Sequence, residues 1–382
     1  MLAVANKKQA AILVPTEVLA RQHFESINEF LKGSRVRTDL VVGSMNSAER
    51  AAAHRFLARG ETDIVVGTHA LLTADVNFAR LGLAVVDEQH RFGVAQRAGL
   101  KYKGTATDTL VMTATPIPRT LAMTLFGDLD VSVIDELPPG RKPVRTLRFP
   151  LEEERKAIAL IREELSNGGQ AFVISPYIEA TATDDFRSAL ATYERFGEKI
   201  FADYSVGLVH GRMPPAKREM EMERFRRGET DVLISTVIVE VGIDMPNASV
   251  MFIQHAERFG LSTLHQLRGR VGRGKRISYC LCTADLTNDQ SRERLEVFCS
   301  TTDGFRIAEE DLRLRGPGEV LGTKQHGLPA LKWGSFPDDY DVLKLARTEA
   351  FRLVESGWRP PDHLRAEMQR CTPSNPNYST VG

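Results

Sequence analysis

The 382-residue sequence has no hydrophobic run long enough to cross a membrane. A membrane-spanning helix needs about 20 mostly apolar residues, and every apolar stretch here is far shorter. The first fifteen residues, MLAVANKKQAAILVP, lack the basic segment that opens a signal peptide, and Asn6, Lys7 and Lys8 interrupt their apolar stretches. We therefore expect a cytoplasmic protein with no membrane contact.

Cysteine is also scarce, and no charge sign prevails. The four cysteines, Cys280, Cys282, Cys299 and Cys371, form neither a C-x-x-C pair nor a zinc-binding spacing. They are typical of buried thiols in a reducing compartment. Lys plus Arg and Asp plus Glu both number 50, so the net charge is zero. This balance argues against a uniformly basic surface for nucleic acid but leaves room for a local basic groove.

A phosphate-binding P-loop is missing as well. The stretch GRVGRGKR (269–276) has the spacing Gly-x-x-x-x-Gly-Lys, but Arg276 stands where the motif needs Ser or Thr. A P-loop follows a buried strand and opens a helix. Here the helical segment LSTLHQLR precedes the glycines and the strand-like ISYCLCT follows them. We therefore do not interpret this stretch as a P-loop.

Short apolar segments alternate with amphipathic ones along most of the chain, as in α/β proteins. The apolar segments are rich in β-branched residues and apolar throughout, which is typical of strands buried on both faces of a parallel sheet. We expect a helix over Thr16–Leu31 and strands at 10–15, 63–68, 83–88 and 109–115. These elements predict a first α/β unit with a parallel sheet.

A second α/β unit is predicted after the Pro-rich segment ELPPGRKPVRT (136–146), which has the composition of a linker. We expect a helix at 152–166 and strands at 170–177, 206–211, 231–236, 249–254 and 277–283, followed by helices and loops. RFLARGETDIVVGTHAL (55–71) is similar to RFRRGETDVLISTVIV (224–239), which favours a duplicated unit over two unrelated ones.

The segment LAVVDEQHRFG places Asp87 and Glu88 at the carboxyl end of a predicted buried strand. Ligands of open α/β sheets bind at this edge. Adjacent carboxylates there suit magnesium chemistry, in which one holds the ion through water and the other polarises an attacking water. An Asp that caps the following helix is the structural alternative.

Seven motifs in a fixed order resemble those of superfamily 2 helicases and translocases. They are PTEVLARQH (15–23), GTHALL (67–72), DEQH (87–90), TATPIPRT (113–120), LVHGRM (208–213), STVIVEVGIDMPNA (235–248) and QLRGRVGRG (266–274). The resemblance implies two RecA-like lobes that close on ATP. The segment DLRLRGPGEVLGTKQHGLP (311–329), with RFGVAQR (91–97), is similar to RecG-type branch-migration helicases. A transcription-repair coupling factor or an RNA helicase is the alternative within the superfamily.

The RecG resemblance implies roles for single residues in ATP hydrolysis. Asp87 matches the magnesium-coordinating acid and Glu88 the group that orients the hydrolytic water. Arg270 and Arg273 match arginine fingers, and they share a face if their segment is helical, because they stand at i and i+3. Gln266 belongs to the same catalytic motif, and Gly242 and Asp244 match residues that bind the nucleotide from the second lobe.

The resemblance also implies DNA contacts and coupling residues. Hydroxyls and loop amides bind phosphates without reading bases, which suits a motor that steps along any sequence. The implied DNA contacts are Pro15, Thr16, Arg21, Gly67, Thr68, His69, His210, Gly211 and Thr236. The implied coupling residues are Thr113, Thr115, Arg313, Arg315, Gly316, Gly318 and Gln325. Ordinary strand-end turns, and structural roles for the two histidines, are the alternatives.

The resulting expectation is an α/β fold with two RecA-like lobes and an incomplete first lobe. We expect a first lobe at 1–137, a linker at 138–146, a second lobe at 147–287, a RecG-type hairpin, loop and helices at 288–372 and a disordered tail at 373–382. The resemblance implies ATP and Mg²⁺ as cofactors and branched duplex DNA, such as Holliday junctions and replication forks, as partner of a monomer.

RecG-type proteins carry a P-loop and a junction-gripping wedge domain ahead of the first motif found here. Neither occurs in this sequence, so we interpret it as an N-terminally truncated chain that by itself has little ATPase or helicase activity. A non-catalytic module that holds branched DNA is the alternative from another functional class.

Overall fold

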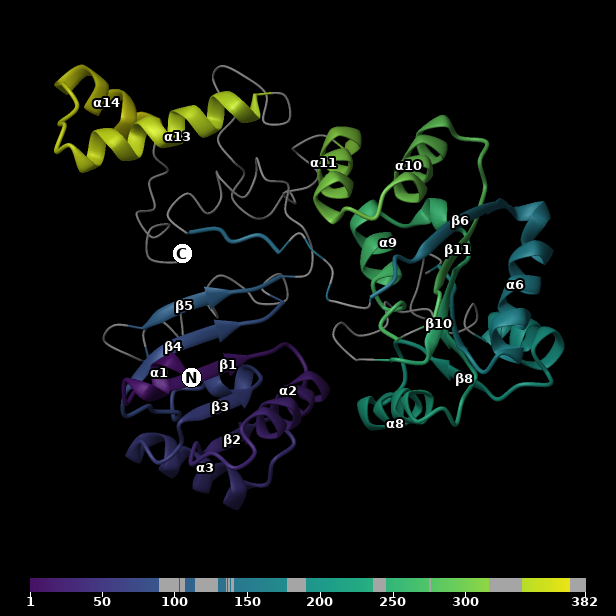
Figure 1. Ribbon diagram of the computed structural model, residues 1–382, viewed down its shortest axis with the longest axis horizontal. Coiled ribbons are helices and arrows are strands. Elements are labelled where there is room, and N and C mark those ends of the chain that lie inside the picture. The colour runs from purple at the N-terminus through teal and green to yellow at the C-terminus, as the bar shows by residue number, and fades with distance from the viewer. Residues whose placement is uncertain are drawn as a thin grey trace. The chain divides into compact units, whose positions relative to one another are not determined.

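The computed structural model describes residues 1–88, 103, 107–113, 130–134, 136, 138, 141–176, 190–235, 245–274, 276–315 and 339–371. These residues divide between two compact units, Met1–Thr115 and Pro116–Pro373. Each unit has its own parallel sheet between helices, which confirms the predicted fold class (Figure 1). Within the described ranges, no helix is both long enough and apolar enough to cross a membrane.

The first unit has five parallel strands in the order β2-β3-β1-β4-β5. They are β1 (Gln9–Leu13), β2 (Thr38–Val41), β3 (Ile64–Gly67), β4 (Leu81–Val86) and β5 (Asp108–Val111). A short helix, α1 (Leu2–Ala5), leads into β1. The sequence predicted all of these strands except β2, which begins with two polar residues, Thr38 and Asp39, and is therefore not apolar throughout.

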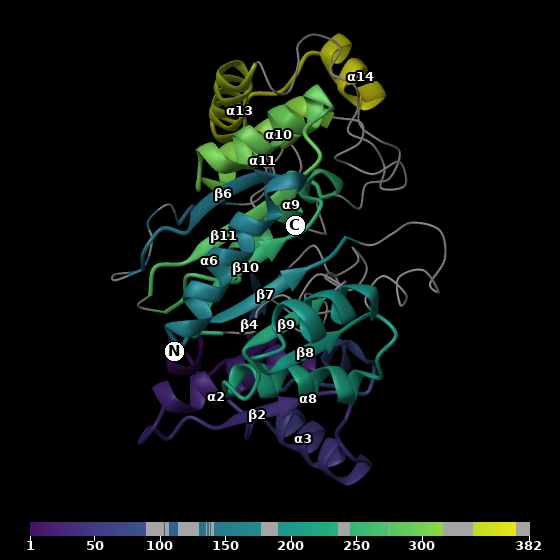
Figure 2. The ribbon, with the colours of Figure 1, turned by 90° about the vertical axis from the view of Figure 1, so that its right-hand side faces the viewer.

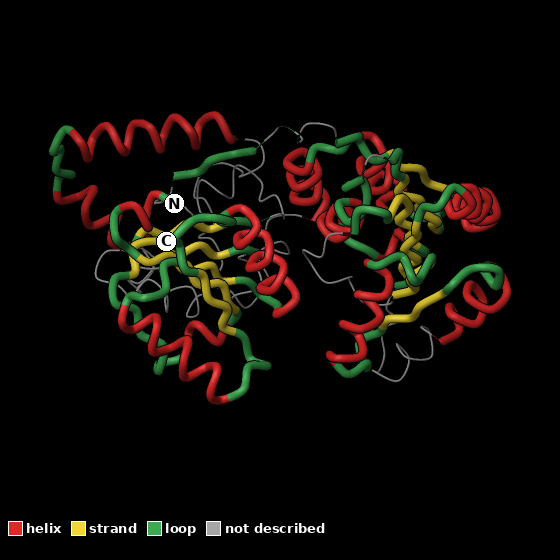
Figure 3. Tube along the Cα trace, turned by 60° about the horizontal axis from the view of Figure 1, so that its bottom comes forward, coloured by secondary structure: helices red, strands yellow, loops and turns green. Residues whose placement is uncertain are grey.

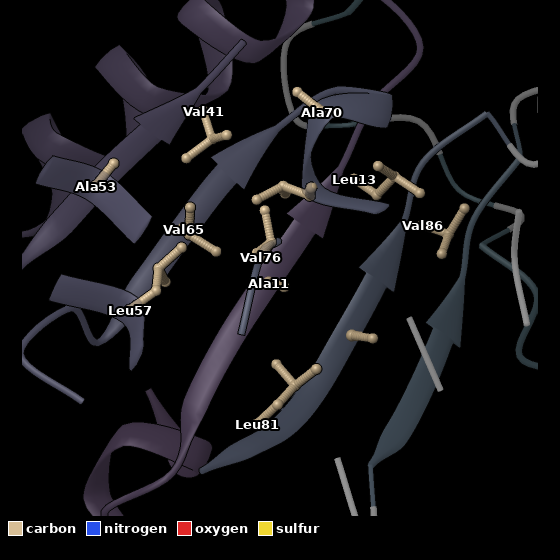
Figure 4. Close-up of a cluster of buried hydrophobic side chains, with 12 residues drawn as sticks. Ala11, Leu13, Val41, Ala53, Leu57, Val65, Ala70, Val76, Leu81 and Val86 are labelled. Atoms are coloured by element: carbon tan, nitrogen blue, oxygen red, sulfur yellow. The ribbon is translucent and has the colours of Figure 1, made fainter. Parts of the chain in front are cut away.

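Two helices cover opposite faces of this sheet. Leu19 and Ala20 of α2 (Glu17–Phe30) pack on one face against Val42 and Val66. On the other face, Ala53 and Leu57 of α3 (Ser47–Arg59) join side chains of β1 to β4 (Figure 4). This second cluster contains Ala11, Leu13, Val41, Val65, Leu81, Ala84 and Val86. Burial on both faces explains why these strands are apolar throughout.

The second unit has six parallel strands in the order β6-β11-β10-β7-β9-β8. They are β6 (Arg145–Pro150), β7 (Gln170–Ile174), β8 (Val206–Val209), β9 (Val232–Ser235), β10 (Ala248–Ile253) and β11 (Tyr279–Ala284). One face packs against α6 (Glu154–Ser166) and a π-helical segment, Glu194–Ile200. On the other face, Phe225 of α8 (Pro215–Arg226) contacts Phe172, with ring centroids 4.7 Å apart. Figure 2 shows this sheet with its helices.

Strand β6 was not predicted, and it begins at Arg145, inside the segment expected to be a linker. It pairs with β11 from Arg145 to Pro150. Helix α9 (Leu261–Arg268) precedes β11. Beyond β11 the described chain is helical, as expected, and contains α10 (Asp289–Ser300), α11 (Gly304–Arg315), α13 (Tyr340–Glu355) and α14 (Asp362–Cys371) (Figure 3).

The two sheets repeat one arrangement. Read from β8, the second sheet has the order β8-β9-β7-β10-β11-β6, so its first five strands match β2-β3-β1-β4-β5 in turn. The similar R-G-E-T-D segments precede β3 and β9, and their glycines, Gly60 and Gly228, have φ values of 70° and 75°. Among the described residues, the first sheet has no counterpart of β6. There β5 lies at the sheet edge, and Leu110 is 51% exposed.

A buried glutamine makes the same contacts in both units. The Nε2 of Gln9 donates to the carbonyls of Leu57 and Thr62, at 3.0 and 2.9 Å. The Nε2 of Gln170 donates to the carbonyls of Phe225 and Thr230, at 2.6 Å each. These four carbonyls lie at matching positions of the two R-G-E-T-D segments. Identical contacts at matching positions support a duplicated unit.

Replacing Gln170 with Ala is expected to destabilise the second unit by about 2–4 kcal/mol, because two buried carbonyls lose their donor. Urea unfolding followed by circular dichroism measures the change. The matched control is Gln290→Ala, at an exposed position of α10, with an expected effect below about 0.5 kcal/mol. Equal midpoints for the two variants would show that the Gln170 contacts contribute nothing.

Candidate functional site

Asp87 and Glu88 follow β4 at the carboxyl edge of the first sheet, as predicted. The Asp87 amide donates to the carbonyl of Leu13 at 2.9 Å, which extends the β1–β4 pairing by one residue. The carboxylate is held on both sides. Its Oδ1 accepts from the Glu88 amide at 2.9 Å, and its Oδ2 lies 3.3 Å from Nε2 of His23 on α2.

Glu88 is buried, at 5% exposure, and has a φ of 53°, in the left-handed region. A non-glycine residue in this region is strained by about 1 kcal/mol or more, and such residues cluster at functional sites. Within the described ranges, no group of three or more His, Cys, Asp or Glu residues could hold a metal ion. A single carboxylate that holds the ion together with several waters suits magnesium better than zinc or calcium.

The loops after β1 and β3 lie beside this acid pair at the same edge. Thr16 caps α2, and its Oγ1 accepts from the Leu19 amide at 3.4 Å. Thr68 is buried, and its Oγ1 has no hydrogen-bond partner among the described residues. Gly67 ends β3 where only glycine fits, since an added Cβ would lie 2.3 Å from the carbonyl oxygen of Val41. His69 and Pro15 complete these loops, and Thr113 follows β5 at the same edge.

The loop after β2, residues 42–46, was missed as a candidate. Its signal was an internal similarity: VGSMNSAER (42–50) matches HGRMPPAKR (210–218), which includes the predicted DNA contacts His210 and Gly211. Both loops close with the same hydrogen bond, from the Met45 amide to the Val42 carbonyl at 3.4 Å and from the Met213 amide to the His210 carbonyl at 3.1 Å. Arg21, a predicted contact, reaches this loop with Nη2 3.4 Å from Ser44 Oγ.

In the second unit, His210 and Gly211 follow β8 at the carboxyl edge of the sheet. His210 is 9% exposed. Seven further predicted residues lie outside the part of the chain that the structure describes. They are Thr115, Thr236, Gly242, Asp244, Gly316, Gly318 and Gln325.

The segment that carries the predicted arginine fingers is not helical. Gln266 lies on α9, but the helix ends at Arg268, so Arg270 and Arg273 stand on the loop that follows. The condition for a shared helical face is therefore not met: Arg270 is 5% exposed, whereas Arg273 is exposed. The helix has already ended at Arg268, and Gly272, between the two arginines, has a φ of 79°, which lies outside the helical region and excludes a helix that joins them.

This loop lies at the amino edge of the second sheet, opposite the predicted DNA contacts. An added Cβ on Gly274 would lie 2.3 Å from the carbonyl oxygen of Pro246, just before β10, and Arg141, just before β6, donates to the Gly272 carbonyl at 3.2 Å. Strands of four to six residues separate the two edges by about 13–20 Å. Within this unit, the two predicted groups of residues therefore lie at opposite edges of the sheet.

Arg268, which was not predicted, joins α9 to its neighbours. It is 3% exposed, and its Nη1 donates to the carbonyls of Phe298 and Thr301 at 2.9 Å each and to Thr146 Oγ1 at 3.2 Å. Its guanidinium lies over the Phe298 ring. The residue thereby satisfies carbonyls at the end of α10, and burial lowers its pKa.

The Nδ1 of His265 lies 3.1 Å from the Nη2 of Arg268. Because Arg268 is a donor, this His265 nitrogen must accept, so the ring is neutral. Burial, and then the charge of Arg268, lowers the pKa of His265 from 6.5 to about 4.

Acid is expected to destabilise the second unit through His265. Its folded pKa lies below its unfolded value, so the stabilisation is fully present above pH 6.5 and is lost as the pH falls towards 4. The loss is on the order of 3 kcal/mol. Urea unfolding between pH 7 and 4 should show a shallower decline for His265→Asn than for the unaltered chain. His363→Gln, at an exposed site on α14, is the control and should keep the full decline.

The described part of the predicted coupling element packs on α9. Ser262 Oγ of α9 donates to the buried Asp311 of α11 at 3.0 Å. Arg313 of α11 pairs with Glu310 and with Glu293 of α10, at 2.7 and 2.6 Å, and both carboxylates raise its pKa. The backbone of Arg315 ends α11. The helix that carries Gln266 is thus joined directly to the helix that carries Arg313.

Three family models match the chain in succession. Residues 1–124 match "DEAD/DEAH box helicase", residues 155–275 match "Helicase conserved C-terminal domain" and residues 301–365 match "ATP-dependent DNA helicase RecG, domain 3, C-terminal". A solved structure described as RecG bound to a three-way DNA junction aligns with a TM-score of 0.72 and 43% identity, over 88% of this chain and 44% of that one. A yeast Dbp5 structure, at 17% identity and a TM-score of 0.52, shares the fold.

Curated relatives agree with these matches. The RecG helicase of Synechocystis is 50% identical over 93% of this chain and 43% of its own length, and that of Thermotoga maritima is 44% identical over 94% and 46%. The RecG helicase of Bacillus subtilis is 43% identical over 96% and 54%. The chain thus spans about half the length of the curated relatives it matches. Over that span, the chain is similar throughout to RecG-type ATP-dependent DNA helicases.

Proposed function

We propose that this chain is the motor portion of an ATP-dependent helicase that acts on branched DNA, in branch migration and fork reversal. One observation carries the proposal: both sheets have the same strand order and carry similar loops at the same carboxyl edge. In the first sheet, these loops combine an acid pair with hydroxyl and amide donors. This combination suits a motor that holds DNA phosphates and a magnesium nucleotide at one edge.

For the nucleotide, the chain's own residues divide into three roles. Asp87, oriented by the Glu88 amide and His23, would hold Mg²⁺ through water, and Glu88 would orient the attacking water. Arg270 and Arg273 would stabilise negative charge that develops on phosphate, with Gln266, Gly242 and Asp244 as further contacts. When bound, magnesium supplies charge neutralisation at the phosphate oxygens.

For coupling, the α9–α11 contacts support a path from α9, the helix that precedes the predicted finger loop, to the RecG-type element. Ser262–Asp311 and the Arg313 ion pairs join α9, α10 and α11. We propose that Arg313, Arg315, Gly316, Gly318 and Gln325, with Thr113 and Thr115, pass on the nucleotide state. Cytoplasmic location and a monomeric state belong to the same proposal.

The DNA contacts are expected to be phosphate contacts. Thr68→Val keeps the shape of the side chain and removes its unpartnered hydroxyl, so binding to a three-way junction should weaken about 3–10-fold, equally for different sequences. Fluorescence anisotropy with a labelled junction and a linear duplex measures both affinity and junction preference. Thr230→Val is the matched control, since this buried hydroxyl lies just before β9, at the amino edge, and also has no hydrogen-bond partner in the described part of the chain.

A second candidate function is supported by the absence of a P-loop from the sequence. A non-catalytic module would use the same loops to hold branched DNA without turnover. Both candidates require the chain to bind the junction, so loss of binding contradicts both, whereas ATP hydrolysis by this chain contradicts only the non-catalytic candidate.

A further inference from the structure

The turn at Gly43–Ser44 already holds a carboxylate. The Ser44 amide donates to Glu17 Oε1 at 2.9 Å, and the Ser44 hydroxyl donates to Glu17 Oε2. The Gly43 backbone closes on the same group, because a Cβ added there would lie 3.1 Å from Glu17 Oε1. The Ser44 amide and hydroxyl are the kinds of donor that also bind phosphate, and Gly43 lets the backbone come close to the anion.

Two arginines support this turn. Arg21 Nη2 lies 3.4 Å from Ser44 Oγ, so it adds a positive charge beside the bound carboxylate. Arg50 Nη2 donates to the carbonyls of Gly43 and Met45, at 2.8 and 3.3 Å, and these hydrogen bonds stabilise the turn. Gly43 and Ser44 are exposed, so a ligand from solvent can reach them.

The turn is also continuous with the proposed DNA contacts. The Thr68 amide donates to the Val41 carbonyl at 3.2 Å, which places the unpartnered Thr68 hydroxyl next to the start of the loop. In the second unit, the equivalent loop carries His210, Gly211 and, in place of Ser44, the cation Arg212. Both copies of the loop therefore offer an anion a binding group at the same position.

We propose that the Gly43–Ser44 turn is a binding site for a DNA phosphodiester and that Glu17 occupies it when DNA is absent. A backbone phosphate would exchange with the Glu17 carboxylate, which swings out to solvent. The inference rests on the proposed DNA-binding function. Its consequence is that Glu17 competes with DNA and weakens binding at this loop.

A double-mutant cycle on the 382-residue chain tests the proposal, with a labelled forked duplex as probe. Glu17→Gln removes the competing charge and should tighten binding about 3–10-fold. Ser44→Ala should change binding less than about twofold in the unaltered chain, because the hydroxyl is lost equally from the Glu17-bound and the DNA-bound states. In the Glu17→Gln background, the same substitution should weaken binding about 3–10-fold.

Glu25→Gln is the matched control, because Glu25 is exposed on the same helix and its substitution removes the same negative charge. Equal gains for Glu17→Gln and Glu25→Gln would overturn the proposal, as would an equal effect of Ser44→Ala in both backgrounds. Thermal unfolding of each variant confirms that it is folded. Inorganic phosphate that competes with DNA only in the Glu17→Gln chain supports the site, and competition of equal strength in both chains contradicts it.

Failure of the inference is distinguishable from failure of the proposed function. If the unaltered chain binds the fork and Thr68→Val weakens it, but the cycle shows no coupling, only the Glu17 exchange is wrong. If the unaltered chain does not bind the fork at millimolar concentrations or below, the proposed function is wrong, and the exchange is rejected with it.

Discussion

Mixed with ATP, magnesium and a forked DNA, this chain is expected to hydrolyse ATP at least about 10³-fold more slowly than the intact Bacillus subtilis relative. The amides and lysine of a P-loop hold the β- and γ-phosphates, and losing one element of such a charge-stabilising site can cost on the order of 10³ in rate. The printed sequence contains no Gly-x-x-x-x-Gly-Lys-Ser/Thr. A coupled ATPase assay measures the rate, and turnover comparable to that of the relative would contradict the prediction.

The control is Arg276→Ser, which completes the P-loop pattern at residues 269–276. It should restore no activity, because the pattern lies in the wrong context: α9 precedes it, β11 follows it and no helix begins at its end. Arg276 instead donates to the Asn167 carbonyl, on the loop after α6. A gain in activity from this substitution would show that the glycines of this loop do cradle a nucleotide.

Gly274→Ala is expected to destabilise the second unit by about 3 kcal/mol or more. The new Cβ would lie 2.3 Å from the carbonyl oxygen of Pro246, and a backbone atom cannot yield as a flexible side chain can. The loop that carries Arg270 and Arg273 would have to move away from the start of β10. Urea unfolding measures the loss, and hydrogen exchange at β10 and β11 localises it.

Gly269→Ala is the matched control in the same loop. Its nearest contact would be the Gln266 carbonyl oxygen at 3.4 Å, an ordinary distance, and its φ of −67° suits alanine. The expected change is within about 0.5 kcal/mol. If the two glycines tolerate alanine equally well, the close approach of the loop to Pro246 is not a constraint on the fold.

The two strands that the sequence did not predict, β2 and β6, both lie at sheet edges, whereas the other two edge strands, β5 and β8, were predicted. β2 (TDLV) and β6 (RTLRFP) alternate or mix polar and apolar residues, since one side of each strand has no neighbour and partial exposure is tolerated. The central strands β1, β7 and β10 were predicted because burial on both faces makes most of their positions apolar. Edge position depends on which strands pair, and a single segment does not carry that information.

The candidate site divides in the same way. The position of Asp87 and Glu88 was predictable, because a buried strand must end before two carboxylates. The contact of His23 with Asp87 was not predictable, since 64 residues separate them and only the packing of α2 on the sheet joins them. The same holds for Gln9 and Gln170, which the sequence presents as ordinary polar residues and the fold buries against carbonyls about 50 residues away.

The α/β class, the two repeated units, the family resemblance and the order of the motifs could all be predicted from the sequence, because burial patterns and glycine positions are local properties of the chain. Tertiary structure decided where those motifs meet. It placed the predicted fingers and the predicted DNA loops of the second unit at opposite edges of one sheet, and it seated Glu17 in the Gly43–Ser44 turn. These relations depend on strand order and on the direction of each crossover, which are fixed only when distant segments pack together.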